Sequence, residues 1–542
     1  MPRFAALDLG SNALRLRIVE AHAASPRDQL SLLPDPTSTW REVVNLRAAV
    51  RLGSEVFVTG KLATASIGQA CTALREFRQS MDDAKVDAYR ATATSAVREA
   101  SNGATLVERA WREAGIELEV IEGIEEARLI QLAVVRRLGL TDKRALLVDV
   151  GGGSTELTYM DHGRSVWATS LPIGTVRLLE MYLRGQKTVD SGLQKLLFEG
   201  VDRALAEAIP TLKKMPFEVM VGTGGSVDTL VELCPLKGDH AGFSRVVDVG
   251  LVKVLLGQLF KMTPEERRET YSLRPDRADT IVTASSIFLR VAELLKTPAI
   301  VAPGVGLKEG ILEELIDRHF DCWDEQAEAR TVVETCVRIG KRYGFDQAHG
   351  ELVASLASSL FDDMASFHGF GERERLLLRA AALLHDVGDY VRYDGHHKHS
   401  YYLIQNSDIM GLSPAERAIV ANVARYHRKS PPDPSHPNFR DLDKEARTKV
   451  RGLAAILRIA DALDREHLGK VQSVRADIDV KARKMHLIAT GDEHRELEEW
   501  TVRAKSELFR EVFDLEVSLT ASSASVRPIP KETLSTTTSR PR

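Results

Sequence analysis

The chain has 542 residues, which is too many for one ordinary hydrophobic core, so two or three domains are expected. Apolar residues make up 44% and charged residues 28% of the chain, a composition typical of globular proteins. The formal net charge of −4 excludes a protein that binds nucleic acid through its overall charge, and a polyanionic ligand would need a local positive patch.

The cysteines and the apolar segments indicate which cellular compartment to expect for the protein. None of the four cysteines forms a CxxC pair, which fits a reducing compartment and provides no zinc-finger or disulfide framework. The N-terminus enters an apolar strand directly, without the basic region and long apolar stretch of a signal peptide. No window approaches the roughly 18 uninterrupted apolar residues of a membrane span. We therefore expect a cytoplasmic protein with neither nucleic acid nor a membrane as a partner.

The first part of the chain alternates predicted strands and helices. Residues 4–20 are typical of a strand, a tight turn and a second strand, and helical spacing follows over residues 61–80, 104–114 and 125–138. Apolar strands at 145–148 and 217–221 each run into a glycine-rich turn. Strands interleaved with helices predict an α/β fold, and the weak repeat of strand and turn predicts two similar α/β domains that face a cleft.

The pattern changes after Phe320. It is helical from about 325 to 467, and eight of the 15 histidines fall between His349 and His436. Residues 470–520 return to alternation, with a helix and a last apolar strand near 513–519. The residues after 520 are rich in Ser, Thr and Pro and are expected to be disordered. The predicted domains are 1–135 and 136–320 (α/β), 325–467 (helical), 468–520 (small α+β piece) and 521–542 (tail).

Three glycine-rich turns, each directly after an apolar strand, predict a phosphate site. Such turns place several backbone N–H groups around a small concavity that binds phosphate oxygens, and glycine lets the backbone approach closely. Two of the turns begin with an aspartate, Asp8 or Asp149, which can hold Mg²⁺ or Mn²⁺. A single glycine-rich turn is most often an ordinary turn. Three such turns in similar settings favour a phosphate-binding role. The third turn offers Gly224, Gly225 and Ser226 as candidates for binding phosphate.

Two further charged positions could complete a site for phosphoryl transfer. Arg98 follows a run of small residues and could bind phosphate through two hydrogen bonds, although most such arginines lie on a helix surface. Glu125 and Glu126 begin a helix, where acids are favoured whatever the function, and one of them could orient and deprotonate an attacking water. A phosphate-binding loop, Mg²⁺ and a water-positioning residue are the parts that phosphoryl transfer requires.

Seven segments of the first 320 residues together resemble the exopolyphosphatase/guanosine-pentaphosphatase (Ppx/GppA) family, a branch of the actin-like, sugar-kinase and heat-shock ATPase superfamily. They are LDLGSN (7–12), ATATSAVREASN (91–102), GIEEARL (123–129), VDVGGGSTEL (148–157), LPIGTVRL (171–178), VGTGGS (221–226) and GVGLKEG (304–310). The resemblance implies two actin-like α/β domains, and a hydrolase that releases terminal phosphate from inorganic polyphosphate or guanosine pentaphosphate, a nucleotide of the stringent response. It also implies Mg²⁺ or Mn²⁺ as cofactor and a homodimer.

The resemblance also implies roles for individual residues. Glu126, directly before the Ala-Arg pair, corresponds to the catalytic base, and Asp149 corresponds to the metal-linked acid. Glu156 corresponds to a second acid and Arg98 to a phosphate-facing arginine. The positions that correspond to the family's phosphate-binding loops are Ser11, Asn12, Gly151, Gly153 and Ser154. The chain departs from the family's pattern at Glu122, which adds an acid near the site.

A set of histidines and aspartates in the helical region resembles the ligands of HD-type metal phosphohydrolases. His385 and Asp386 lie in LLHDVG, His349 begins an earlier helix, and Asp461 lies in a later one. Two imidazoles and two carboxylates suit a divalent cation that activates water, so the resemblance implies a possible second metal in an all-α HD-type domain. Long members of the family carry such a domain, and whether it is catalytic or only binds substrate stays open.

Basic residues in the same region could line a cationic groove for a long polyphosphate, although charge runs also mark ordinary solvated surfaces. These residues are His396, His397, Lys398, His399, Arg425, His427, Arg428 and Lys429.

Two alternative functions remain: a sugar or acid kinase on the same scaffold, and a non-catalytic sensor of alarmone nucleotides or polyphosphate. The GIEEARL segment disfavours the kinase, and the intact set of acids disfavours the sensor.

Overall fold

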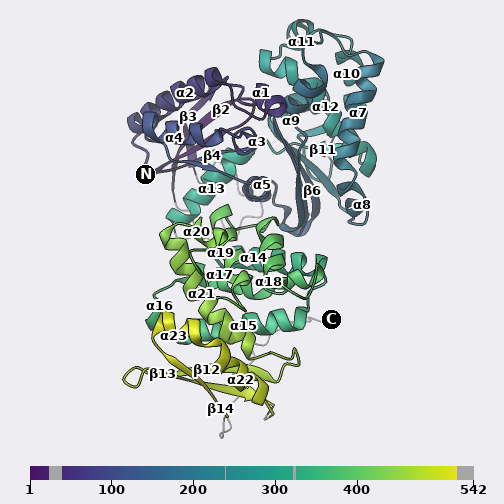
Figure 1. The fold of residues 1–542 in the computed structure, drawn as a ribbon. Coiled ribbons are helices and arrows are strands. Elements are labelled where there is room, and N and C mark those ends of the chain that lie inside the picture. Colours follow the sequence, from purple (N-terminus) through teal and green to yellow (C-terminus); the bar gives the residue numbers. More distant parts are fainter. Residues whose placement is uncertain (23–39, 239, 321–324, 493, 522–542) are drawn as a thin grey trace, which may run out of the picture. The chain divides into compact units, whose positions relative to one another are not determined.

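The computed structural model describes residues 1–22, 40–238, 240–320, 325–492 and 494–521 (Figure 1). The chain forms two compact units, Met1–Thr331 and Val332–Arg542, which are described separately below. The predicted disordered tail lies outside the described residues from position 522 onward. Among the residues described, no helix has the length and apolar character needed to cross a bilayer.

The first unit contains two sheets, and each forms the centre of one lobe. The first sheet has the order β3-β2-β1-β4-β5. Strand β1 pairs antiparallel with β2 and parallel with β4, and it is buried along nearly its whole length, as expected for an apolar central strand. The strands of this sheet are β1 (Arg3–Leu9), β2 (Leu14–Ala21), β3 (Trp40–Ala48), β4 (Ala88–Ala93) and β5 (Leu118–Val120). Its helices are α1 (Gly53–Thr59), α2 (Thr64–Asp83), α3 (Ser95–Glu99) and α4 (Gly103–Ala114).

The second sheet repeats the first. Its order is β10-β11-β9-β6-β7-β8, in which β6 pairs antiparallel with β7 and parallel with β9. The run β8-β7-β6-β9-β11 therefore has the strand order and directions of β3-β2-β1-β4-β5, with β10 added antiparallel at the edge. The predicted α/β fold with two actin-like domains is confirmed. The strands are β6 (Arg144–Val150), β7 (Thr155–Asp161), β8 (Arg164–Leu171), β9 (Val219–Thr223), β10 (Val246–Asp248) and β11 (Ala299–Val301).

The helices of the second lobe cover this sheet. Helix α12 is buried along most of its length and contacts α7, α9 and α10. A short π-helical turn at Leu179–Leu183 follows α6. The helices are α6 (Thr175–Leu178), α7 (Ser191–Leu205), α8 (Ala208–Leu212), α9 (Gly225–Leu233), α10 (Val249–Leu259), α11 (Pro264–Tyr271) and α12 (Pro275–Leu295).

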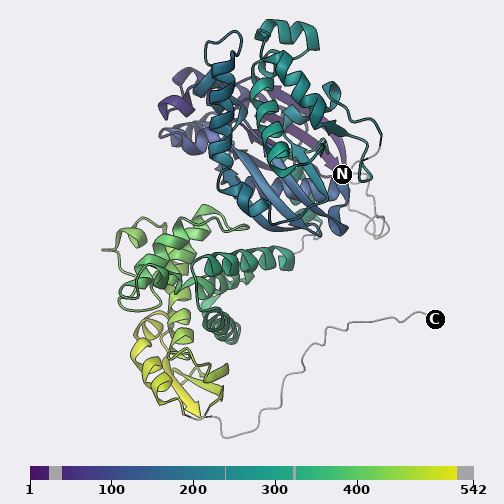
Figure 2. The same cartoon turned by 90° about the vertical axis from the view of Figure 1, so that its right-hand side faces the viewer.

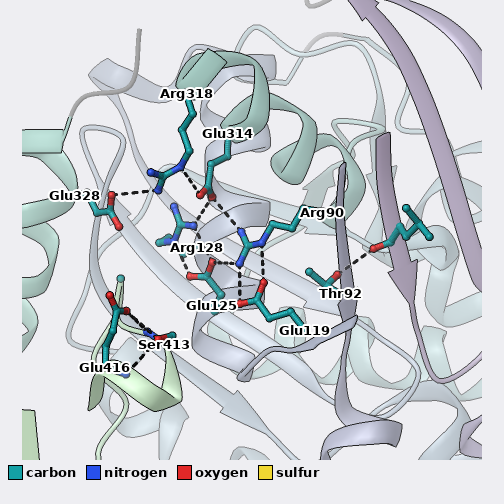
Figure 3. Close-up of polar contacts among 12 residues, drawn as sticks. Arg90, Thr92, Glu119, Glu125, Arg128, Glu314, Arg318, Glu328, Ser413 and Glu416 are labelled. Carbon is teal, nitrogen blue, oxygen red and sulfur yellow. Dashed lines mark hydrogen bonds and ion pairs between the residues drawn. The ribbon is translucent and has the colours of Figure 1, made fainter. Parts of the chain in front are cut away.

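Two helices, α5 (Gly123–Leu138) and α13 (Leu307–His319), pack against each other and join the lobes. Helix α5 contacts β7 and β8, whereas α13 contacts β1, β2 and β4, so the last helix of the predicted 136–320 domain packs on the first sheet. Charged side chains reinforce this packing (Figure 3): Arg128 on α5 donates to Glu314 on α13, and Arg90 on β4 donates to Glu125 and Glu314. Because these partners come from three elements, the N-terminal half of α5 is held firmly in place.

The second unit is a helical bundle followed by a small sheet (Figure 2). Helix α21 is buried along most of its length and contacts α15, α17 and α19. The helices are α14 (Glu325–Arg342), which begins before the boundary, α15 (Gln347–Asp363), α16 (Ala365–His368), α17 (Glu372–Leu384), α18 (His396–Gln405), α19 (Pro414–Arg425), α20 (Pro437–Arg440) and α21 (Lys444–Ala462). Strands β12 (Val471–Asp479), β13 (Lys484–Gly491) and β14 (Glu516–Ala521), with α22 (Glu496–Lys505) and α23 (Glu507–Phe513), form the predicted α+β piece.

Candidate functional site

Three carboxylates meet in the first unit at the point where α5 lies against the second sheet. Glu126 comes from the first turn of α5, Asp149 from the end of β6 and Glu156 from β7. Asp149 and Glu156 are directly paired across the antiparallel strands, so their side chains lie on the same face of the sheet. One oxygen from each of the three lies within 4.8 Å of the others, and all three residues are buried.

Hydrogen bonds orient two of these three carboxylates, but some of the carboxylate oxygens have no hydrogen-bond partner among the described residues. Thr223 donates to Oδ1 of Asp149 at 2.5 Å, and Ser170 donates to Oε1 of Glu156 at 2.7 Å. Oε2 of Glu126 and Oε2 of Glu156 are buried and have no hydrogen-bond partner among the described residues. Buried oxygens without a donor are costly. A divalent cation that prefers oxygen ligands, such as Mg²⁺ or Mn²⁺, would fit this donor set.

Burial and the charges of neighbouring carboxylates, which for Asp149 means that of Asp8, raise the pKa of all three carboxyl groups. Burial raises the pKa of Asp149 to about 6, and burial with the charge of Asp149 raises the pKa of Glu156 to about 7. The pKa of Glu126 lies well above its usual value because the group is buried and faces the charges of Glu156 and Asp149. A carboxylate with such a raised pKa is suited to take up a proton near neutral pH.

These shifts predict that Mg²⁺ stabilises the protein more at about pH 8 than at about pH 5. The folded-state pKa values of Asp149 and Glu156 lie above those of an unfolded chain, so their burial costs stability as the pH rises through about 4 to 7. At higher pH the carboxylates are ionised and can bind the cation directly, which stabilises the folded protein. At lower pH the carboxyl groups are protonated, so the cation must displace protons and binds more weakly. The measurement is the difference in melting temperature between Mg²⁺ and EDTA at both pH values.

The substitution Asp149→Asn should reduce the Mg²⁺ effect at the higher pH, because it removes one of the three charges. The matched control is Asp142→Asn, which changes an exposed aspartate outside the carboxylate group. Equal stabilisation by Mg²⁺ at both pH values would contradict a cation site in this cluster.

The three glycine-rich turns line one cleft of about 800 Å³ together with Glu126 and Asp149. Asp8 lies in the cleft wall, where its Oδ2 accepts a hydrogen bond from Arg15 at 3.0 Å, and it stands apart from the three-carboxylate group. The predicted residues that line the cleft are Asp8, Ser11, Asn12, Glu126, Asp149, Gly151, Ser154, Gly224, Gly225 and Ser226.

Three predicted residues do not line this cleft. Gly153 is packed against Phe57 and Ser95, where a β-carbon would approach each side chain to 2.3 Å. Arg98 donates to the carbonyl of Ile121 at 2.6 Å, yet its charge still acts on Glu126 by lowering its pKa against the larger effect of burial. Glu156 does not line the cleft, but one of its oxygens belongs to the carboxylate cluster.

Several positively charged side chains line the cleft, and no sequence motif predicted that they would lie together. Arg277, in the first turn of α12, donates to Ser226, and burial lowers its pKa to about 10. The alternation along β2 could have indicated Arg15 and Arg17, because neighbouring residues of a strand at that spacing share a face. The cationic lining residues are Arg15, Arg17, Arg47, Arg274, Arg277 and Lys308.

The four predicted ligands of the helical unit converge on one point. Nε2 of His349 lies 3.2 Å from Nε2 of His385. Oδ2 of Asp386 lies 3.8 Å from His349 Nε2 and 3.5 Å from His385 Nε2. Oδ1 of Asp461 lies 3.8 Å and 3.6 Å from the same two nitrogens. The structure therefore brings together the four residues that the sequence pattern grouped.

Part of the cationic groove expected in the same region is formed by a small pocket of about 240 Å³, which His396, His427, Arg428 and Lys429 line. His396, His397 and His427 are buried, so they do not form an exposed row of charges.

The fold and the site define a two-lobed α/β protein whose lobes share a cleft lined by carboxylates, glycine-rich turns and cations. The chain belongs to the Ppx/GppA phosphatase family. This family matches residues 37–319, and the family's domain III matches residues 332–507. Membership confirms the expectation of an enzyme from the phosphatase class.

Similar proteins span most of the chain. The guanosine-5'-triphosphate,3'-diphosphate pyrophosphatase of Vibrio parahaemolyticus is 27% identical over 429 residues, which cover 79% of this chain and 81% of the relative. The protein of the same name from Aeromonas hydrophila is 26% identical over 464 residues, or 85% of this chain and 87% of the relative. The crystal structure of an exopolyphosphatase from Cytophaga hutchinsonii superposes with a TM-score of 0.51 at 27% identity, covering 58% of this chain and 98% of that one.

Proposed function

We propose that this protein hydrolyses phosphoanhydrides and releases terminal orthophosphate from inorganic polyphosphate, guanosine pentaphosphate or both. The observation that carries the proposal is the buried cluster of Glu126, Asp149 and Glu156 at a cleft lined by glycine-rich turns. The names of the relatives support these two substrates, because one group acts on guanosine pentaphosphate and another on polyphosphate.

In the proposed reaction the terminal phosphate lies against the backbone of the glycine-rich turns. Glu126 orients a water molecule, which attacks the terminal phosphorus while the anhydride P–O bond to the rest of the chain breaks. The proton lost by water passes to Glu126, whose raised pKa favours its uptake. Held by Asp149 and Glu156, with Asp8 as a further candidate, Mg²⁺ or Mn²⁺ would neutralise charge on the phosphoryl group.

The cationic wall of the cleft favours a polyanion over the acceptor of a kinase. Arg277 and Lys308 are both largely buried, and burial lowers the pKa of each, so an anionic ligand would relieve part of the cost of burying their charge. A sugar hydroxyl carries no charge to offer these cations, whereas polyphosphate, guanosine pentaphosphate and the ATP of a kinase all do. A non-catalytic sensor would use the same wall, and only turnover distinguishes it from the hydrolase.

The test is phosphate release by the purified chain with Mg²⁺, using long-chain polyphosphate and guanosine pentaphosphate in parallel. Release from either substrate supports the proposal and establishes its preference. Tight binding of guanosine pentaphosphate without release from either substrate would overturn it in favour of the sensor. Transfer from ATP to a sugar, without release to water, would instead indicate the kinase.

A further inference from the structure

The three carbonyl groups of the glycine turn 151–153 all accept hydrogen bonds from the start of helix α6. Backbone N–H groups supply three bonds of 2.8–3.0 Å, which are Thr175 to Gly151, Val176 to Gly152 and Arg177 to Gly152. The fourth bond comes from a side chain: Nε of Arg177 donates to the carbonyl of Gly153 at 2.6 Å. The start of α6 therefore holds the whole carbonyl side of this turn.

The same contact leaves an N–H group of the turn available to a ligand. In a trans peptide the N–H points away from the carbonyl, so the N–H of Gly152 points away from the carbonyl of Gly151 that α6 binds. Gly152 lines the cleft, and its N–H donates to no acceptor within the part of the chain that the structure describes. Backbone N–H groups held in this way bind phosphate oxygens.

Arg177 also contacts two elements of the first lobe. Its Nη2 donates to Oε1 of Glu99 on α3 at 2.5 Å. Its guanidinium carbon lies 4.1 Å from the centre of the Phe57 ring on α1, and the same ring packs on Gly153. The side chain of Arg177 is only 10% exposed. The guanidinium is therefore enclosed by the glycine turn of the second lobe and by two helices of the first.

We infer that Arg177 is a positioning residue for phosphoryl transfer: it holds the glycine turn 151–153 in its binding geometry and links that geometry to the contact between the two lobes. This inference rests on the proposed function, because the turn belongs to the same cleft. Arginine suits the role, since its planar guanidinium can donate to a carbonyl and a carboxylate while it stacks on an aromatic ring. Arg177 does not line the cleft, so it acts through the turn and not on the substrate.

The competing explanation is that Arg177 only stabilises the fold. A buried charge needs a partner, and Glu99 provides one whatever the function of the turn. A purely structural arginine predicts that its loss lowers stability and leaves each folded molecule fully active. A positioning residue predicts that each folded molecule turns over more slowly, because the turn no longer presents its N–H group correctly.

The first experiment compares kcat and KM of full-length variants with whichever of the two substrates the wild type hydrolyses. Arg177→Ala should lower kcat by about 10²-fold, the loss expected when a backbone donor to the transferred group is misplaced. KM should change much less, because the cationic side chains of the cleft still bind the rest of the polyanion. Arg177→Lys keeps a cation in place and should fold, yet it should also lose turnover, since lysine cannot reproduce the planar pattern of donors.

The matched control is Arg184→Ala, which removes an arginine that is 59% exposed and pairs with Glu180. Its kcat should equal that of the wild type. Equal turnover per folded molecule in Arg177→Ala and the wild type would overturn the inference.

The link to the first lobe is tested by Glu99→Ala alone and combined with Arg177→Ala. Glu99→Ala should lower kcat less than Arg177→Ala, because the bond from Nε to Gly153 remains. The double variant should be no slower than Arg177→Ala, since Glu99 acts through that arginine. Losses that simply add would show that Glu99 acts independently and would overturn the link.

Millimolar guanidinium chloride should restore part of the turnover of Arg177→Ala, because the free cation can occupy the space of the missing side chain. Guanidinium chloride lowers the free energy of unfolding, so it would worsen a purely structural defect. Turnover that only falls as guanidinium is added would assign Arg177 to folding alone and overturn the positioning role.

Amide hydrogen exchange in the full chain tests how the turn is held without any need for turnover. The amide hydrogens of Thr175 and Val176 are donated to carbonyls of the turn, so they should exchange faster in Arg177→Ala than in the wild type or in Arg184→Ala. Mass spectrometry of peptides that end before residue 177 gives the comparison. Unchanged exchange would overturn the inference even if the chain releases phosphate as proposed. Faster exchange in a chain that releases no phosphate would support the hold of Arg177 on the turn and contradict the proposed function alone.

Discussion

Glu126→Gln should lower the turnover of phosphate release by at least about 10²-fold, while substrate still binds. Glutamine has the shape of glutamate but cannot accept the proton of the attacking water. Glu126 is buried beside Asp149 and Glu156, and it lines the cleft that contains the glycine-rich turns. The turnover number and the dissociation constant of substrate should be measured separately, because loss of a base changes the first far more than the second.

The same substitution should stabilise the metal-free protein at about pH 8, since it removes one of three buried like charges. Glu125→Gln is the matched comparison on the same helix turn. Glu125 accepts hydrogen bonds from Arg128 and Arg90, so its substitution should lower the melting temperature but change turnover much less. Wild-type turnover in Glu126→Gln would disprove the assignment of the base, and a larger loss in Glu125→Gln would transfer the role to that residue.

Gly310→Ala should disrupt the junction of α5 and α13 and reduce both stability and turnover. A β-carbon at Gly310 would lie 1.9 Å from the carbonyl oxygen of Leu129, so the backbones of the two helices must separate. Overpacking of this kind costs about 1–3 kcal/mol of unfolding free energy. Leu129 lies one helical turn after Glu126, and a displacement of about 1 Å at a catalytic group can cost about 10²-fold in rate.

Gly68→Ala is the matched control, because Gly68 lies within helix α2 and a β-carbon there meets no atom within 4 Å. It should raise the unfolding free energy by about 0.5–1 kcal/mol, as expected for alanine in place of a helical glycine. Chemical denaturation and phosphate release measured on both variants give the comparison. A Gly310→Ala protein as stable and active as the control would show that the close contact of the helices is not needed.

The sequence by itself determined the elements whose signals are local. Apolar strands that end in Asp-x-Gly turns are visible as short patterns, and both lobes contain them as expected. Asp149 lies within such a pattern, whereas Glu126, His385 and Asp386 were proposed from short segments that resemble known families. The duplicated strand order follows from repeated strand and turn units, although the repeat is weak in the residues themselves.

The tertiary structure alone decided which distant residues share a site. Helix α13 packs on the first sheet although it follows the second in the chain, and Arg277 reaches the cleft from the start of α12. His396 and His427 are separated by 31 residues, yet their nitrogens meet at Asp386. Spacing along a helix or strand predicts neighbours only within that element. The packing of separate helices depends on their complete buried surfaces, so no short motif encodes which side chains converge.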